Sequence, residues 1–238
     1  GFDIVIYTGD HIEPWGPPSI LEKGLGGSET AVIYLAKYLQ QSGKKVLVLG
    51  EPGGYIGNHD GVTYYPADYL TAGMKCDIFV CSRRPQVIDI DIDANRKWLW
   101  LHDTNVGGML TEDRIKKFDK FLFVSEWQKL QYQRMYGIPD EVCHVTSNGI
   151  EPSVFEKIPD GGVKDPYRFV YSSSPDRGLT HLLDMWPDIY TLYPQASLHI
   201  FYGWDNYDKF TSMYPAMKFE KEVIMKKVKA FEPLGVTM

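Results

Sequence analysis

The chain has 238 residues, a formal net charge of −6, 44% hydrophobic residues and 14% aromatic residues. This composition fits a globular protein of one large domain or two small ones and excludes a disordered chain. The negative charge argues against a general nucleic-acid-binding protein, whose binding domain would be basic. No apolar run approaches the roughly 18 residues of a membrane span, and no signal peptide opens the sequence. We therefore expect a cytoplasmic protein, in which Cys76, Cys81 and Cys143, an odd number without CxxC spacing, are reduced thiols.

Apolar runs of strand length recur through the first part of the chain. They cover residues 2–9, 45–50, 77–82, 97–102, 120–125 and 141–146. The runs are continuous rather than alternating, which is typical of strands buried on both faces of a parallel sheet. Helical patterns lie between them: 28–43 ends at a glycine, and 125–137 opens with Ser125 and Gln128 at capping-box spacing. Strand–helix alternation of this kind predicts a doubly wound α/β domain.

A change of composition marks a second region. Residues 151–166 contain three prolines and a Gly-Gly pair, as in a linker. The pattern after it predicts strands at 167–173 and 197–203, helices at 178–191 and 217–231, and a further strand beginning at 235. We place one domain at 1–158 and a second at 159–238. A half-sheet of this size buries little apolar surface, so we expect the sequence to stop partway through the second domain.

A glycine-rich stretch, KGLGGSET at 23–30, precedes the first predicted helix. It does not match the dinucleotide fingerprint GxGxxG, because Glu29 stands where the third glycine is required. A helix that starts here would present free N–H groups and the positive end of its dipole to an anion. Gly26 and Gly27 would let that anion approach the backbone closely. The alternative is a glycine-rich turn in which Ser28 is simply the N-cap.

Five further motifs follow in order: WLWLHD, FVSEWQ, YGIPDEV, SNGIEPSVF and SSSPDRGL. Together with GGSE, they resemble the family-four retaining glycosyltransferases of GT-B fold. Those enzymes have an N-terminal Rossmann-like domain with a GGxE-type loop and a strand-end histidine, and a C-terminal domain that binds the nucleotide-sugar. The resemblance covers nearly the whole chain. It implies a GT-B-like α/β fold, with an N-terminal Rossmann-like doubly wound parallel sheet and the first part of a second Rossmann-like domain. By the same resemblance, 1–158 is the acceptor-side domain and 159–238 is part of the nucleotide-sugar-binding domain.

The resemblance assigns roles to particular residues. His102 corresponds to the catalytic residue that contacts the donor sugar near the reacting carbon, although a lone histidine could also be a satisfied core residue. Gly26, Gly27 and Arg177 correspond to the groups that hold the donor diphosphate. Trp204 follows a predicted strand, and we expect it in an exposed loop on the donor side. The remaining residues expected in the substrate cleft are Ser28, Asp103, Ser125, Glu126, Asn148, Gly149 and Ser173.

The sequence departs from the family pattern in two places. The family has an arginine a few residues before the lysine that Arg177 replaces, whereas SSSP at 172–175 offers only hydroxyls. The family's pair of glutamates, eight positions apart in the C-terminal domain, has no counterpart before Met238. These residues grip the nucleotide ribose and the donor sugar in the family.

The implied function is hexosyl transfer, with retention, from a UDP- or GDP-linked sugar to a glycan, glycoconjugate or other hydroxyl acceptor. Two alternatives remain: a truncated, non-catalytic unit that binds a sugar or nucleotide-sugar, and a GT-B sugar-nucleotide epimerase. We expect no metal or other cofactor, because DIDID at 89–93 imitates a DxD metal motif but reads as a solvent-facing strand, and the histidines lack metal-ligand spacing. No nucleic acid is expected as a partner, and peripheral membrane contact is compatible with a lipid-linked acceptor. The donor base, acceptor and oligomeric state stay open.

Overall fold

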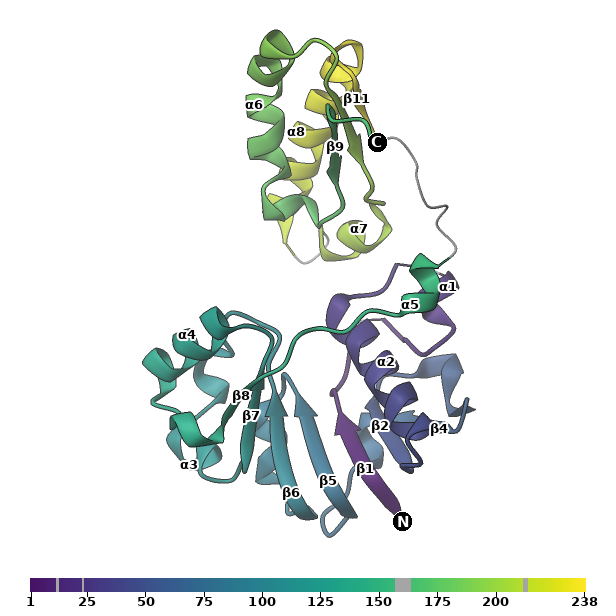
Figure 1. The fold of residues 1–238 in the computed structure, drawn as a ribbon, viewed down its shortest axis with the longest axis vertical. Coiled ribbons are helices and arrows are strands. Elements are labelled where there is room, and N and C mark those ends of the chain that lie inside the picture. The colour runs from purple at the N-terminus through teal and green to yellow at the C-terminus, as the bar shows by residue number, and fades with distance from the viewer. Residues whose placement is uncertain (12, 23, 157–163, 212–213) are drawn as a thin grey trace. The chain divides into compact units, whose positions relative to one another are not determined.

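The structure, a computed structural model, describes residues 1–11, 13–22, 24–156, 164–211 and 214–238. The chain forms two compact units, Gly1–Lys157 and Ile158–Met238, each described by itself below (Figure 1). The predicted boundary between residues 158 and 159 lies outside the described residues.

The first unit is built on an eight-stranded sheet in the order β3-β4-β2-β1-β5-β6-β7-β8. The strands are β1 Phe2–Tyr7, β2 Val46–Gly50, β3 Gly57–His59, β4 Val62–Pro66, β5 Lys75–Ser82, β6 Asp93–Trp100, β7 Lys120–Phe123 and β8 Cys143–Val145. Neighbouring strands are parallel except β3 and β4. Because β1 lies between β2 and β5, the strand order reverses there, which makes this edge a topological switch point.

The six strands predicted from apolar runs are present in this unit, but the β3–β4 hairpin was not predicted. Its turn is Asp60–Gly61, and both residues have positive φ (51° and 85°). An Asp-Gly pair between short strands is a strong hairpin signal. We missed it because β3 is short and polar, whereas the other strands were found by their apolar runs.

The α-helices of the first unit are α1 Ser19–Glu22, α2 Gly27–Gln41, α3 Glu112–Ile115, α4 Glu126–Tyr136 and α5 Pro152–Phe155. Its 3₁₀ turns are η1 Gly53–Tyr55, η2 Ala67–Tyr69, η3 Pro85–Asp89, η4 Gly107–Met109 and η5 Asp140–Val142. None of the helices in the described part of the chain is long and apolar enough to cross a bilayer. Within the first unit, α2 and α4 are the two longest helices, and they match the predicted helical segments 28–43 and 125–137.

Alternate residues of the strands form two apolar layers. On one face, Val5, Leu49 and Phe121 belong to a cluster that includes Tyr132 of α4. On the other face, Ile4 and Ile6 pack with Val32, Ile33 and Ala36 of α2. The sheet is therefore covered on both faces, as expected for parallel strands. Figure 1 shows α2 and α4 over different parts of this sheet.

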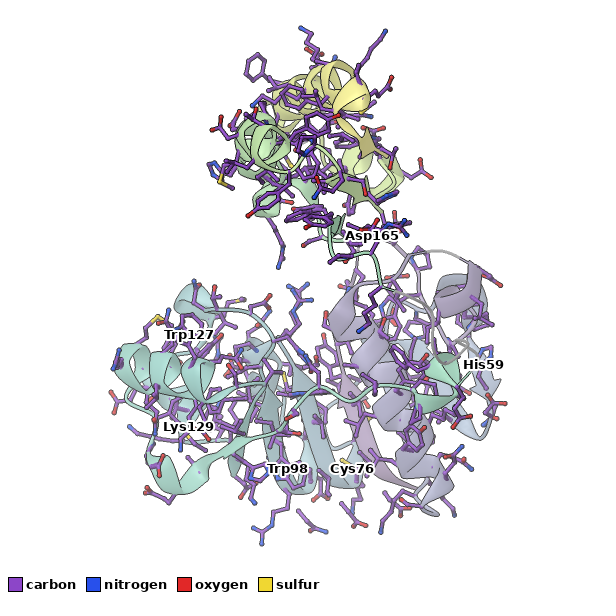
Figure 2. All side chains as sticks on the ribbon, turned by 45° about the horizontal axis from the view of Figure 1, so that its top comes forward. His59, Cys76, Trp98, Trp127, Lys129 and Asp165 are labelled. Atoms are coloured by element: carbon purple, nitrogen blue, oxygen red, sulfur yellow. The ribbon has the colours of Figure 1, made fainter. Side chains whose placement is uncertain are left out.

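An apolar groove of about 610 Å³ lies on the α2 face of the sheet. Strands β5, β6 and β7 form its floor, with Ile78, Trp98 and Leu122 among the lining side chains; Trp98 is labelled in Figure 2. The indole N–H groups of Trp98 and Trp100 are buried there without a hydrogen-bond partner among the described residues. The groove thus lies over the strands themselves, on the face of the sheet that α2 covers.

The segment DIDID does not form the predicted strand. Residues 85–89 form η3, and β6 begins only at Asp93. The carboxylate of Asp89 accepts hydrogen bonds from Arg114 (2.6 Å) and Lys117 (3.0 Å), and Arg114 holds the pKa of Asp89 down at about 2. Ile92 is buried in the core. The segment is therefore a turn that places Ile92 in the core, whereas Ile90 is exposed.

The second unit contains a three-stranded parallel sheet in the order β11-β10-β9. Its elements are β9 Arg168–Tyr171, η6 Pro175–Arg177, α6 Leu179–Leu192, β10 Ser197–Ile200, α7 Asp205–Thr211, α8 Pro215–Phe231, η7 Glu232–Leu234 and β11 Val236–Thr237. Trp186 of α6 is fully buried, and its Nε1–H donates to the Leu234 carbonyl (2.9 Å). Helix α7 was not predicted.

Gly137 ends α4 in the left-handed region (φ 67°). Replacement by alanine should lower the free energy of unfolding by about 1 kcal/mol, because a Cβ is strained at this φ. Urea unfolding of Gly137→Ala measures the loss. Gly54→Ala is the matched control, since φ at Gly54 is not positive and a Cβ there meets nothing within 4 Å. An equal loss in both variants would contradict the explanation.

Candidate functional site

Polar groups gather at the carboxyl ends of the parallel strands around the switch point. Gly9 follows β1, Arg83 follows β5, His102 follows β6 and Ser125 follows β7. The N-terminus of α2, which contains the glycine loop, reaches the same edge, because Arg83 contacts Ser28 there. Open α/β sheets bind ligands at such an edge.

The glycine loop opens α2 as expected for an anion-binding turn. Gly26 is the N-cap, with extended backbone (φ −61°, ψ 150°) and no side-chain cap. Ser28 lies inside the helix, so the prediction that Ser28 is the N-cap is wrong, whereas the choice between an anion site and a plain glycine-rich turn stays open. The carboxylate of Glu29 folds back over the N-cap: a Cβ on Gly26 would lie 2.1 Å from Glu29 Oε2, whereas one on Gly27 would meet nothing within 4 Å.

Glu29 and Ser28 form the polar centre of this loop. The Ser28 hydroxyl donates to the Glu29 carboxylate, with both oxygens at 3.0 Å. Nδ1 of His11, which follows β1, lies 3.4 Å from Glu29 Oε1. Burial lowers the pKa of His11, an effect that Glu29 partly offsets. Since the Glu29 side chain is only 12% exposed, water and salt screen its charge poorly.

Arg83 is the cation that lies close to Glu29, and no sequence motif had pointed to it. Its Nε and Nη2 donate to the two carboxylate oxygens of Asp103 (2.7 and 3.2 Å). Its Nη1 donates to Ser28 Oγ (2.9 Å) and lies 3.5 Å from Glu29 Oε1. One guanidinium therefore joins the glycine loop to the turn after β6. The signal that could have found it is the pair of arginines directly after a buried strand.

His102 lies at this edge as predicted, half buried against Trp100, whose ring centroid is 4.4 Å away. Its Nε2 is buried without a hydrogen-bond partner among the described residues. Burial, reinforced by the positive charge of Arg83, lowers the pKa of His102 to about 4. The imidazole is therefore neutral near pH 7, which suits a group that orients a substrate.

Two side chains of α4 hold the backbone of Asp103 in place. The Asp103 carbonyl accepts hydrogen bonds from Gln128 Nε2 (2.8 Å) and the Tyr132 hydroxyl (3.2 Å). Ser125 caps α4 by accepting from the Gln128 N–H (3.2 Å), as the capping-box spacing predicts. The Gln128 side chain accepts from the Val124 N–H (2.8 Å), one residue before the usual position. Ser125 thus has a structural role in holding the site.

The remaining predicted residues of the first unit are exposed. Glu126 begins α4 beside the same edge, and Asn148 and Gly149 lie in the irregular segment after β8. That segment is anchored by Glu151, which accepts hydrogen bonds from Lys37 Nζ (2.8 Å) and the Tyr38 hydroxyl (3.1 Å) of α2. The segment that follows β8 is therefore held against α2, the helix that begins at the glycine loop.

In the second unit, the predicted residues lie in two places. Arg177 is exposed in η6, just before α6, with Ser173 exposed in the loop ahead of it. Trp204 is not in an exposed loop as predicted: it is half buried, with Tyr207 at 5.2 Å between ring centroids and Lys221 Nζ 5.1 Å above its ring. Its packing against α7 and α8 explains this position. Whether Arg177 and Trp204 touch a donor stays a prediction from the sequence.

Comparisons with solved structures identify the fold. No protein-family model and no curated protein sequence matches the chain. A glycosyltransferase from Rickettsia africae ESF-5 is similar over 98% of this chain and 67% of its own, with a TM-score of 0.56 and 13% identity. The catalytic domain of starch synthase IV from Arabidopsis thaliana, bound to ADP and acarbose, is similar over 99% and 73%, with a TM-score of 0.53 and 10% identity. WaaG, a glycosyltransferase involved in lipopolysaccharide biosynthesis, is similar over 92% and 68%, with a TM-score of 0.52 and 12% identity. The chain therefore has the fold of these glycosyltransferases, and the predicted fold class is confirmed.

The low pKa of His102 makes stability depend on pH. The unfolded chain binds a proton near pH 6.5 and the folded chain only near pH 4, so this contribution is complete above pH 6.5 and is lost as the pH falls toward 4. Between pH 7.5 and 5.0 the free energy of unfolding should fall about 2 kcal/mol more in the wild type than in His102→Gln. Urea unfolding at both pH values measures the difference.

His181→Gln is the matched control, because His181 is exposed on α6 in the second unit. The free energy of unfolding of His181→Gln should fall as much as that of the wild type between pH 7.5 and 5.0. Identical pH profiles for the wild type and His102→Gln would show that His102 is not buried in its neutral form.

Proposed function

We propose that the chain is the donor-binding part of a glycosyltransferase that moves a hexose from a UDP- or GDP-linked sugar to a glycan or other hydroxyl acceptor. The observation that carries this proposal is the polar edge at the switch point. There an uncapped helix N-terminus, Arg83 and His102 meet in a fold shared with solved glycosyltransferases. The family resemblance assigns the glycine loop to the donor diphosphate and His102 to the donor sugar, and Arg83 lies between them.

The chemistry requires stabilisation of a leaving diphosphate. The C1–O bond to the diphosphate breaks, the acceptor oxygen bonds to C1, and the acceptor proton leaves with the phosphate or with water. Negative charge grows on the diphosphate in the transition state, where fixed dipoles and cations stabilise it most. The N–H groups at Gly26 and Gly27 and the dipole of α2 would serve this purpose. The family resemblance assigns diphosphate binding to Arg177 as well.

His102 would orient the sugar at the reacting carbon. Its imidazole is neutral near pH 7. Its buried Nε2 has no hydrogen-bond partner among the described residues, so this nitrogen would donate or accept according to the tautomer. We propose retention of configuration by same-face attack, without a protein nucleophile and without a metal. These features follow from the family resemblance, as does a glycan acceptor.

The proposal is tested by calorimetric titration of the 238-residue chain and of any longer parent protein with UDP, GDP, ADP and their glucose conjugates. Release of free nucleotide is followed in parallel, with and without EDTA. We expect micromolar to millimolar binding of one nucleotide class and EDTA-insensitive nucleotide release. Binding without release by either protein would identify a non-catalytic binding unit, and absence of binding by both would refute the proposal.

Arg177→Ala tests the cation of the second unit. Loss of a charged hydrogen bond to the diphosphate should weaken nucleoside diphosphate binding about tenfold or more. Arg168→Ala is the matched control, because Arg168 is an exposed arginine of the same unit whose partner is Asp165 (3.7 Å). Calorimetry with both variants measures the effect. Unchanged affinity in Arg177→Ala would remove this residue from the site.

A further inference from the structure

We propose that Arg83 is the positioning residue of the donor site: it neutralises Glu29 and Asp103 and holds the glycine loop of α2 against the turn that contains His102. The inference rests on the proposed function. It assigns a role to a residue outside every motif that suggested that function.

The geometry uses the whole guanidinium group. Two of its nitrogens form a fork on the Asp103 carboxylate, and the third donates to Ser28 Oγ. A planar fork of this kind fixes direction as well as distance, which a lysine ammonium cannot do. Asp103 is the next residue after His102, and Ser28 follows Gly27, so Arg83 sets the spacing between the two predicted contacts of the donor.

Charge gives Arg83 its second role. Glu29 and Asp103 place two carboxylates at the edge where a diphosphate is expected, and Glu29 is nearly buried. The other cation near this edge, Arg84, directs Nη2 to the Asp10 carbonyl (3.3 Å) and packs against Gly9. Without Arg83 the uncompensated carboxylates would repel an incoming polyanion, because like charges in a partly desolvated site interact strongly.

The backbone of Arg83 supports a positioning role. Its φ is +67°, an uncommon conformation for a long side chain. Its N–H donates to the Trp100 carbonyl (3.0 Å), which holds this turn to the end of β6. Residues kept in such a conformation cluster at functional sites, where the surrounding contacts compensate for the strain. At Arg83 those contacts are the ones to Asp103 and Ser28.

The test uses calorimetry with inorganic pyrophosphate and UDP on Arg83→Met and on the double variant Arg83→Met/Glu29→Gln. We expect Arg83→Met to bind both probes at least tenfold more weakly than the wild type. The double variant should recover threefold or more of that loss, because Glu29→Gln removes one unpaired carboxylate. Arg114→Met is the matched control, because Arg114 also pairs with an aspartate, Asp89 (2.6 Å), but outside the site. The Arg114→Met variant should bind both probes with wild-type affinity.

Recovery by Glu29→Gln distinguishes neutralisation from a merely structural role, since a glutamine cannot replace the fork on Asp103. Equal affinities of Arg83→Met and the double variant would overturn the inference, as would wild-type affinity in Arg83→Met. Arg83→Gln replaces Arg83→Met if the latter does not fold, with the same expected results.

A second readout needs no ligand. Removal of the Arg83 charge should raise the pKa of His102, measured by NMR titration of its ring protons, whereas Arg114→Met should leave it unchanged. If the wild type binds neither probe, the proposed function fails and this titration alone decides the role of Arg83. An unchanged His102 titration in Arg83→Met would then overturn it.

Discussion

The parallel register of the first sheet is the constraint on which the site depends. Because β1, β5, β6 and β7 run in the same direction, their carboxyl ends meet at one edge. The reversal of strand order at β1 sends α2 to one face and the segments after β5 to the other. A glycine loop, Arg83 and His102, far apart in the sequence, are therefore brought within hydrogen-bonding or van der Waals range of one another or of shared neighbours.

Two kinds of support hold this edge in place. Below it, Gln128 and Tyr132 of α4 bind the Asp103 carbonyl, so the helix capped by Ser125 fixes the turn after β6. Across it, Arg83 ties Asp103 to Ser28. The first support is built from neutral hydrogen bonds and is independent of pH near neutrality. The second is built from charged groups, the Arg83 guanidinium and the Asp103 and Glu29 carboxylates.

Much of the fold could be predicted from the sequence, because buried parallel strands leave continuous apolar runs and helix ends leave caps such as Ser125 and Gly137. The hairpin β3–β4 and helix α7 were missed because their short segments have no apolar periodicity. Of the site, the glycine loop and His102 could be predicted from motifs. Arg83 was not predicted: the pair of arginines after β5 could have marked it as a candidate, but its role comes from contacts to residues 20 and 55 positions away.

The folded-back carboxylate of Glu29 gives the glycine loop an internal competitor. An anion that approached Gly26 would meet the Glu29 carboxylate, which carries the same sign of charge and already lies over this backbone. In the proposed donor site, a diphosphate would therefore have to displace the Glu29 carboxylate from Gly26. The contacts of Glu29 to Ser28 and Arg83 set how firmly that carboxylate is held.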